Sequence, residues 1–445
     1  MKNNIEEQLE LPCGSMLSNR LCKTAMTEGL SDELNRSTDE LCTLYEKWSK
    51  SGASLLITGN VQIDRRYMER AGNVAIDGKQ SNLQIEKLKK WASAAKINGN
   101  HCWVQLGHAG RQTDARINKV GLGPSPIRSR NIAGQIFMPS YAPKEISISE
   151  IGSIIDKFSY AAKVCKEVGF SGIQIHSAHG YLLSSFLNPL ANVRTDSYGG
   201  KLENRYRLLL EIIIATRRSV GPNFPISVKI NSSDFLRGGL TDQESATICN
   251  ALDSERIDLL EISGGSYENL AIFRGKDALN DKNINEAYFL DSSKEILNTI
   301  KNTPIMLTGG IRKLSTMNDL ISNHNIDMIG LARPLCGLID GPKKLIKKEI
   351  YELPKYEDKI NYPFFLRWLK IFRFGKVIYK AAILLWCYDN IINISKNKPF
   401  DTKGEKINLI NIIIKMYIYE WKKASSLREI KSRGLVYRQN FENLF

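Results

Sequence analysis

Short apolar segments alternate with amphipathic segments along the first 340 residues of the chain. Eight segments have the length and composition of buried strands: residues 20–26, 54–58, 102–106, 172–175, 226–230, 258–262, 305–308 and 327–331. Between them, apolar residues recur at the helical period in residues 39–50, 82–98, 149–168, 202–220, 242–254, 292–301 and 314–321. Two of these predicted helices begin beside a capping residue, Ser149 or Thr241.

Eight strands alternating with helices predict an α/β fold of the (β/α)8 type, the TIM barrel. A doubly wound open sheet is the alternative. No GxGxxG motif follows the first strand, so the fingerprint of a dinucleotide-binding sheet is missing. We therefore expect a TIM barrel at residues 1–340, followed by a mainly helical, basic C-terminal extension at residues 341–445.

Composition narrows the class of protein. The 445 residues are 42% hydrophobic and 24% charged, which is typical of a globular protein. The N-terminal sequence MKNNIEEQLE lacks the apolar run of a signal peptide. The eight cysteines are scattered without a CxxC pair, which argues against a disulfide framework, a zinc site or an iron–sulfur cluster. We therefore expect a cytoplasmic protein.

The net charge of +15 is concentrated in the tail. Residues 341–445 hold 22 Lys and Arg against 10 Asp and Glu, whereas the first 340 residues hold 40 against 37. A solvated helical surface explains this excess, while an anionic membrane surface or nucleic acid would exploit it. Two apolar-rich segments, residues 364–386 and 407–421, predict helices that pack on the outside of the barrel or lie in a membrane interface.

Catalytic groups of a TIM barrel follow the C-terminal ends of its strands. The predicted fourth strand is followed by His176, His179 and Tyr181. Two histidines three residues apart suit a metal, but no third ligand motif accompanies them. The seventh strand ends at Gly309-Gly310 and the eighth is followed by Arg333, a pattern typical of a barrel phosphate site because glycine backbone and a guanidinium both bind phosphate oxygens.

Five ordered motifs resemble the old yellow enzyme family, the FMN-dependent ene-reductases also called NADH:flavin oxidoreductases. They are QLGHAGR at 105–111, HSAHGY at 176–181, FLNPLANVR at 186–194, DSYGG at 196–200 and ENR at 203–205. The resemblance runs from about residue 19 to residue 335. The segment KTAMTE at 23–28 resembles a bacterial and fungal subgroup, some of whose members carry a helical tail.

The resemblance implies an FMN lying across the C-terminal end of the barrel. The residues that it assigns to FMN are Ala25, Met26, Thr27, Gly59, Gln105, Lys229, Gly309, Gly310, Ala332 and Arg333. Among these, Gln105 corresponds to the amide on the flavin pyrimidine edge, and Lys229 to the cation beside flavin N1. The iron–sulfur motif of larger relatives is absent from the sequence, so electrons are expected to pass directly from NADH or NADPH to FMN.

The resemblance also assigns the reaction. His176 and His179 would bind the carbonyl or nitro oxygen of an activated alkene, and Tyr181 would protonate the α-carbon after hydride transfer. NAD(P)H would reduce the flavin in an earlier half-reaction, which gives ping-pong kinetics. The expected partner is this small alkene rather than nucleic acid, with peripheral membrane contact through the tail and a homo-oligomer left open.

Two other functions remain compatible with the sequence. One is a flavin- or phosphate-binding barrel whose main role is association with a membrane or a protein partner. The other is a metal-dependent barrel hydrolase, with His176 and His179 as ligands.

Overall fold

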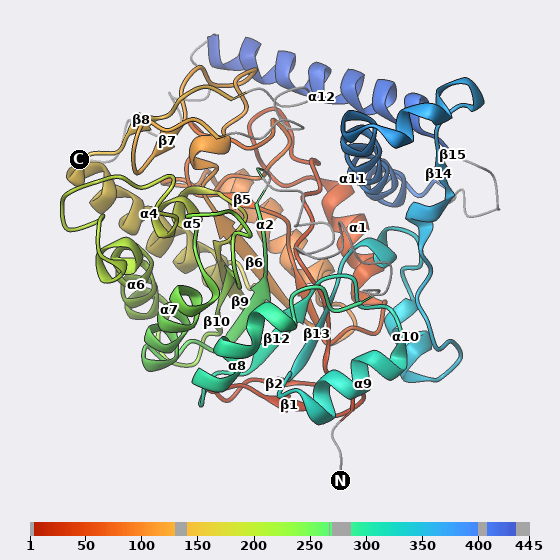
Figure 1. The fold of residues 1–445 in the computed structure, drawn as a ribbon, viewed down its shortest axis with the longest axis horizontal. Coiled ribbons are helices and arrows are strands. Elements are labelled where there is room, and N and C mark those ends of the chain that lie inside the picture. The colour runs from red at the N-terminus through yellow and green to blue at the C-terminus, as the bar shows by residue number, and fades with distance from the viewer. Residues whose placement is uncertain (1–3, 130–139, 267, 269–285, 399–406, 433–445) are drawn as a thin grey trace.

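The computed structural model describes residues 4–129, 140–266, 268, 286–398 and 407–432, and its centre is a closed ring of eight parallel strands (Figure 1). In order around the ring these are β3 (Leu21–Lys23), β4 (Leu55–Ile57), β6 (His101–Gly107), β9 (Gly172–Ser177), β10 (Ile226–Asn231), β11 (Leu259–Ser263), β12 (Ile305–Thr308) and β13 (Met328–Leu331). The last strand pairs with the first, Ile329 opposite Leu21. This pairing confirms the TIM barrel and excludes the open sheet.

Helices surround the ring and alternate with its strands along the chain. They are α1 (Asp39–Ser49), α2 (Asn82–Ala94), α4 (Ile148–Glu167), α5 (Leu182–Leu187), α6 (Leu202–Val220), α7 (Asp242–Ser254), α8 (Lys294–Thr299) and α9 (Leu314–Asn323). Thr241 caps α7 as predicted. The cap of α4 is Ser147 rather than Ser149, because Ser147 forms a reciprocal capping box with Glu150.

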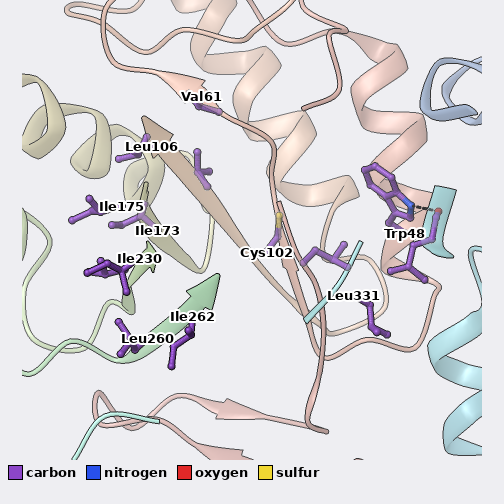
Figure 2. Packing of buried hydrophobic residues seen from close by; sticks show 14 of the residues in the cluster. Trp48, Val61, Cys102, Leu106, Ile173, Ile175, Ile230, Leu260, Ile262 and Leu331 are labelled. Carbon is purple, nitrogen blue, oxygen red and sulfur yellow. Dashed lines mark hydrogen bonds between the residues drawn. The ribbon is translucent and has the colours of Figure 1, made fainter. Parts of the chain in front are cut away.

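Side chains alternate between the helices and the barrel interior along each strand. Figure 2 shows the outer set, in which Ile175, Ile230 and Ile262 pack from three neighbouring strands in the layer beneath the helices. At the N-terminal end of the strands the interior is apolar and includes Trp103. A short hairpin, β1 (Leu9–Glu10) and β2 (Met16–Leu17), covers that end, so function is confined to the opposite end, which we call the barrel mouth.

The tail continues the same hydrophobic core. The extension contains α10 (Gly341–Ile346), strand β14 (Ile360–Asn361), a 3-10 helix η7 (Phe364–Ile371), α11 (Arg373–Ser395), strand β15 (Ile407–Asn408) and α12 (Leu409–Ser432). The helix α11 packs on α1 and on α12, and its Trp386 and Ile391 belong to the main core cluster. The predicted packing of helices against the outside of the barrel is therefore confirmed, while the boundary at residue 340 stays a prediction.

Within the described residues, one helical stretch, Gly375–Ser395, has the length and hydropathy that a membrane span needs. More than half of it is buried inside the protein, as in the core helix of a soluble fold. Length and composition are therefore weak evidence for a span.

Helix α12 lies across the barrel mouth at the opposite end from the β1–β2 hairpin (Figure 1). The Arg70 guanidinium is buried, forms an ion pair with Glu420 and lies 3.9 Å above the ring of Tyr388. The Tyr419 hydroxyl donates to the carbonyl of Gly29 (3.0 Å), and Lys431 Nζ donates to Asn118 Oδ1 (2.5 Å). Loops after three different strands are thus tied to one helix.

We expect Glu420→Ala to destabilise the protein by about 3 kcal/mol, because it leaves the buried Arg70 cation without a counter-charge. Lys90→Ala, which removes the exposed ion pair with Asp39, is the control and should leave the free energy of unfolding nearly unchanged. Urea unfolding followed by circular dichroism measures both. Equal losses in the two variants would contradict a role for the buried pair.

Candidate active site

His176 is the last residue but one of strand β9 and lies in the barrel interior, 4% exposed. Its Nδ1 accepts the backbone N–H of Ala178 (3.2 Å), so the ring proton of the neutral imidazole is on Nε2. Burial, reinforced by the nearby Lys229 cation, holds the pKa of His176 well below its usual value of 6.5. The side chain therefore enters any reaction as a neutral N–H donor.

His179 lies on the loop after β9, with its ring centroid 5.2 Å from that of His176. Its backbone has a φ of 64°, an uncommon value for a residue with a side chain. The ring Nε2 lies 2.8 Å from the hydroxyl of Ser263, which ends strand β11. Burial, Lys229 and His176 together keep the pKa of His179 well below 6.5, so this ring is neutral too.

The strained backbone of His179 is held by a side-chain relay. Asn231 Oδ1 accepts the N–H of His179 (3.2 Å), and Asn231 Nδ2 donates to Asp234 Oδ1 (2.8 Å). Burial raises the pKa of Asp234 to about 6. Because an ionised carboxylate only accepts, Asp234 directs the Asn231 amide nitrogen toward itself and its carbonyl toward His179.

Tyr181 immediately precedes α5 and is buried. Its ring centroid lies 4.8 Å from that of His176, at an angle of 60°. The three side chains predicted from the motif at 176–181 are therefore adjacent in space. Among the described residues, no group of three or more His, Cys, Asp or Glu is arranged to hold a metal, so the hydrolase alternative gains no support.

Strand β11 also carries a fully buried carboxylate, Glu261, inside the barrel. Its Oε1 forms an ion pair with Lys229 Nζ (2.8 Å) and accepts from the Thr308 hydroxyl (2.9 Å). Its Oε2 accepts from Gln174 Nε2 (2.8 Å). Glu261 was not among the predicted site residues, although its place two residues before Ser263 on one strand puts both on the inner face.

Gln105 is joined to this network through Gln174. Gln105 Nε2 donates to Gln174 Oε1 (2.7 Å), and Gln174 Nε2 also donates to the hydroxyl of Ser227 (3.2 Å). Since Glu261 cannot donate, the Gln174 amide nitrogen must face it, which leaves the Gln174 carbonyl for Gln105. The acceptor Oε1 of Gln105 is consequently the end left for another group.

One cavity connects the polar centre of the barrel with the ends of β12 and β13. Its lining includes seven of the predicted residues: Ala25, His179, Lys229, Gly309, Gly310, Ala332 and Arg333. The same lining contains Ser263, Thr308 and Arg312, which are not among the residues that the sequence assigned to FMN or to catalysis. It does not include Met26, Thr27, Gly59, Gln105, His176 or Tyr181.

The far end of the cavity is suited to an anionic group. Gly309 and Gly310 have φ values of 135° and 75°, and a Cβ on Gly310 would lie 2.1 Å from the ring of Tyr288. Glycine is therefore required there, and it leaves bare backbone. Arg333 and Arg312 share one carboxylate, Glu357 of the tail, at 3.0 and 2.5 Å. The two guanidinium groups thus share one side-chain carboxylate, while Glu286 Oε2 accepts the backbone N–H of Arg312 (3.2 Å).

The loop after β3 is fixed by another buried carboxylate. Glu28 accepts the N–H of Gly59 (2.8 Å) and the hydroxyl of Tyr45. The Gly59 N–H is thus already occupied, so any contact of Gly59 with a cofactor has to come from its other backbone atoms. Met26 Sδ lies 3.5 Å from Cys336 Sγ, which places the Met26 side chain beside the 3-10 turn that follows β13.

Comparison with known proteins identifies relatives of the whole barrel. Residues 12–349 match the NADH:flavin oxidoreductase / NADH oxidase family. The chain is 32% identical over 385 residues to the NADH-dependent flavin oxidoreductase iliE of Hypocrea jecorina, covering 82% of this chain and 94% of that protein. It is 30% identical to an NADPH dehydrogenase of Clostridium acetobutylicum, covering 72% of this chain and 88% of that protein.

Solved structures share the fold. The old yellow enzyme homologue from Zymomonas mobilis superposes with a TM-score of 0.66 at 21% identity, over 78% of this chain and 94% of that one. The old yellow enzyme from Pichia sp. gives 0.65 at 22% identity, over 78% and 88%. The closed barrel, the family match and the curated relatives agree, and the chain belongs to the NADH:flavin oxidoreductase (old yellow enzyme) family as an NAD(P)H-dependent flavin oxidoreductase.

Proposed function

We propose that this protein binds FMN and reduces the C=C bond of alkenes conjugated to a carbonyl or nitro group. The observation that carries the proposal is the pair of buried neutral imidazoles, His176 and His179, next to Tyr181 and to the cavity that contains Lys229. FMN, when bound, supplies the hydride that it has received from NADH or NADPH.

The cavity suits FMN at both ends. Gly309, Gly310 and Arg333 would hold the phosphate, with Arg312 contributing charge. Lys229 and the acceptor Oε1 of Gln105 would face the polar pyrimidine edge of the flavin. Ala25 lines the cavity, and Met26 and Thr27 continue the same loop, so the backbone of these three residues would lie along the ring system.

The imidazoles would act on the substrate oxygen. His176 offers Nε2–H, since its Nδ1 is already an acceptor. His179 offers Nδ1–H when the Ser263 hydroxyl donates to Nε2. Negative charge builds on the substrate oxygen as the β-carbon receives hydride, and fixed N–H donors in a buried site stabilise that charge strongly.

Tyr181 would complete the reaction by donating its phenolic proton to the α-carbon. Its burial and its place next to His176 hold the hydroxyl near the bound substrate.

We expect the purified protein to be yellow, to lose its absorbance near the flavin maximum with NADH or NADPH under argon, and to regain it with 2-cyclohexen-1-one. Stopped-flow absorbance measures both half-reactions, and initial rates should show ping-pong kinetics. A preparation that neither carries FMN nor takes it up would contradict the proposal. If oxygen reoxidises the reduced flavin but enones and nitroalkenes do not, the protein is still a flavin oxidoreductase, and the proposed alkene reduction is wrong.

The double variant His176→Ala/His179→Ala should keep FMN but lose the charge-transfer absorbance that a bound phenol produces. Each missing donor is expected to slow enone reduction about 100-fold. In the parent protein the two imidazoles should contribute no titration to this rate near pH 6.5, because an imidazole with a lowered pKa is still neutral as the pH falls through that value. A titration near pH 6 would belong to Asp234, whose ionised form orients the Asn231 amide that holds His179. His324→Ala, at the exposed residue that follows α9, is the control and should change neither property. Loss of FMN from the double variant would make the pair a cofactor site instead.

Glu261→Gln should raise the flavin midpoint potential by about 30 mV or more, equivalent to about 1.4 kcal/mol for two electrons. The reason is that Lys229 then faces the anionic reduced flavin without its counter-charge. Thr308→Val is the control, since it removes one hydrogen bond to the same carboxylate and no charge. Dye-coupled redox titration measures the potentials, and identical values for the two variants would refute this role of Glu261.

A further inference from the structure

The 3-10 helix η7 exposes an unusual set of large apolar side chains. Phe364, Trp368 and Ile371 are 83%, 55% and 78% exposed, and Phe372 directly after them is 54% exposed. The Arg367 guanidinium lies 5.4 Å from the ring of Phe364, so a cation sits within the apolar set. We call these five residues the η7 patch. The rings of Trp368 and Phe372 lie 5.8 Å apart. Isolated exposed apolar residues are ordinary, whereas several large ones on one short segment usually mark an interaction site.

Helix α12 carries a second such set. Ile414, Tyr417, Ile418 and Trp421 are about half exposed and recur at i, i+3, i+4 and i+7, which places them on one face of the helix. The opposite face, with Ile412, Met416, Ala424 and Leu427, is buried against the protein. One apolar face of α12 therefore packs against the protein, and the other apolar face is exposed to solvent. Both η7 and α12 pack against α11.

Charge decides between the partners that an apolar surface could take. Residues 361–388 contain no Asp or Glu and five Lys or Arg: Arg367, Lys370, Arg373, Lys376 and Lys380. On α12 the exposed Lys422 lies beside the apolar stripe, whereas the nearby Lys415 forms an ion pair with Asp389 of α11 (2.5 Å). A second copy of this chain would bring the same positive charge against the patch, at a Coulombic cost. An anionic lipid surface satisfies both features, because headgroups attract the cations while Trp, Tyr and Phe enter the interfacial layer.

The packing of α11 determines how deep such contact goes. Its apolar side chains, including Trp386, Ile391 and Ile392, belong to the protein core. A transmembrane position would expose that core, whereas a peripheral position uses only side chains that the fold leaves outside. The surface is also close to the barrel mouth, since Tyr419 and Lys431 of α12 hydrogen-bond to mouth loops.

We propose that the η7 patch and the outer face of α12 dock this protein onto an anionic phospholipid bilayer without crossing it. The proposal is independent of the alkene reductase chemistry. In this arrangement the basic side chains of the tail contact lipid headgroups, and the exposed aromatic side chains enter the interfacial layer of the bilayer.

Co-sedimentation of the full-length holoprotein with vesicles tests this proposal. We expect binding to phosphatidylcholine vesicles that contain 30% phosphatidylglycerol, little binding to pure phosphatidylcholine, and weaker binding as NaCl rises from 50 to 300 mM. Phe364→Ser/Trp368→Ser/Ile371→Ser should lower the partition coefficient at least tenfold. The matched control, Leu83→Ser/Ile97→Ser/Val193→Ser, removes three exposed apolar side chains from the barrel and should bind as the parent does.

Arg367→Glu gives a second, milder variant that reverses one exposed charge, so the result does not rest on the folding of the triple variant. It should weaken binding to anionic vesicles and leave the circular dichroism spectrum and flavin content unchanged. Absence of parent binding to anionic vesicles would overturn the proposal, as would equal binding to neutral ones. A dimer that the triple variant dissociates, without vesicle binding by the parent, would assign the surface to a second copy and overturn it too.

Discussion

A carboxylate enclosed in a barrel must receive hydrogen bonds or a counter-charge from every side, and in this protein that requirement falls on Glu261. The group has no exposed surface and takes donors from Lys229, Thr308 and Gln174, which lie on three other strands. Because a carboxylate can only accept, it fixes the orientation of the Gln174 amide, and Gln174 in turn fixes that of Gln105. One buried charge thereby orders the polar layer beneath the cavity.

The same physical device recurs around the mouth. Asp234 orients Asn231, which holds the left-handed backbone of His179. Glu28 accepts from Gly59 and Tyr45 and fixes the loop that follows the first strand. In each case a buried acceptor would be costly without hydrogen-bond donors, so the groups that donate to it are held in one arrangement. The side chains proposed for catalysis are thus held in place by preorganised hydrogen bonds.

The tail takes part in this electrostatic arrangement. Glu357 neutralises one of the two positive charges of Arg312 and Arg333 at the proposed phosphate end, and Glu420 compensates the buried Arg70. The mouth loops are consequently stabilised by residues far away in the sequence. The face of the tail that does not contact the barrel remains apolar and basic, which suits a lipid surface.

The sequence by itself determined the order of the eight barrel strands and of seven helices around them, the family motifs and the adjacency of His176, His179 and Tyr181, because hydrophobic period and strand-end position are local properties. It did not predict helix α5 or the β1–β2 hairpin, which are short. It missed Ser147 as a cap, since several serines compete there and only backbone geometry selects one. It also missed Glu261, Gln174, Arg312 and Glu357. Each of these residues acts through a charged or amide partner on another strand or in the tail. Such partners are far apart in the sequence, and only the tertiary structure brings them within about 3 Å of each other.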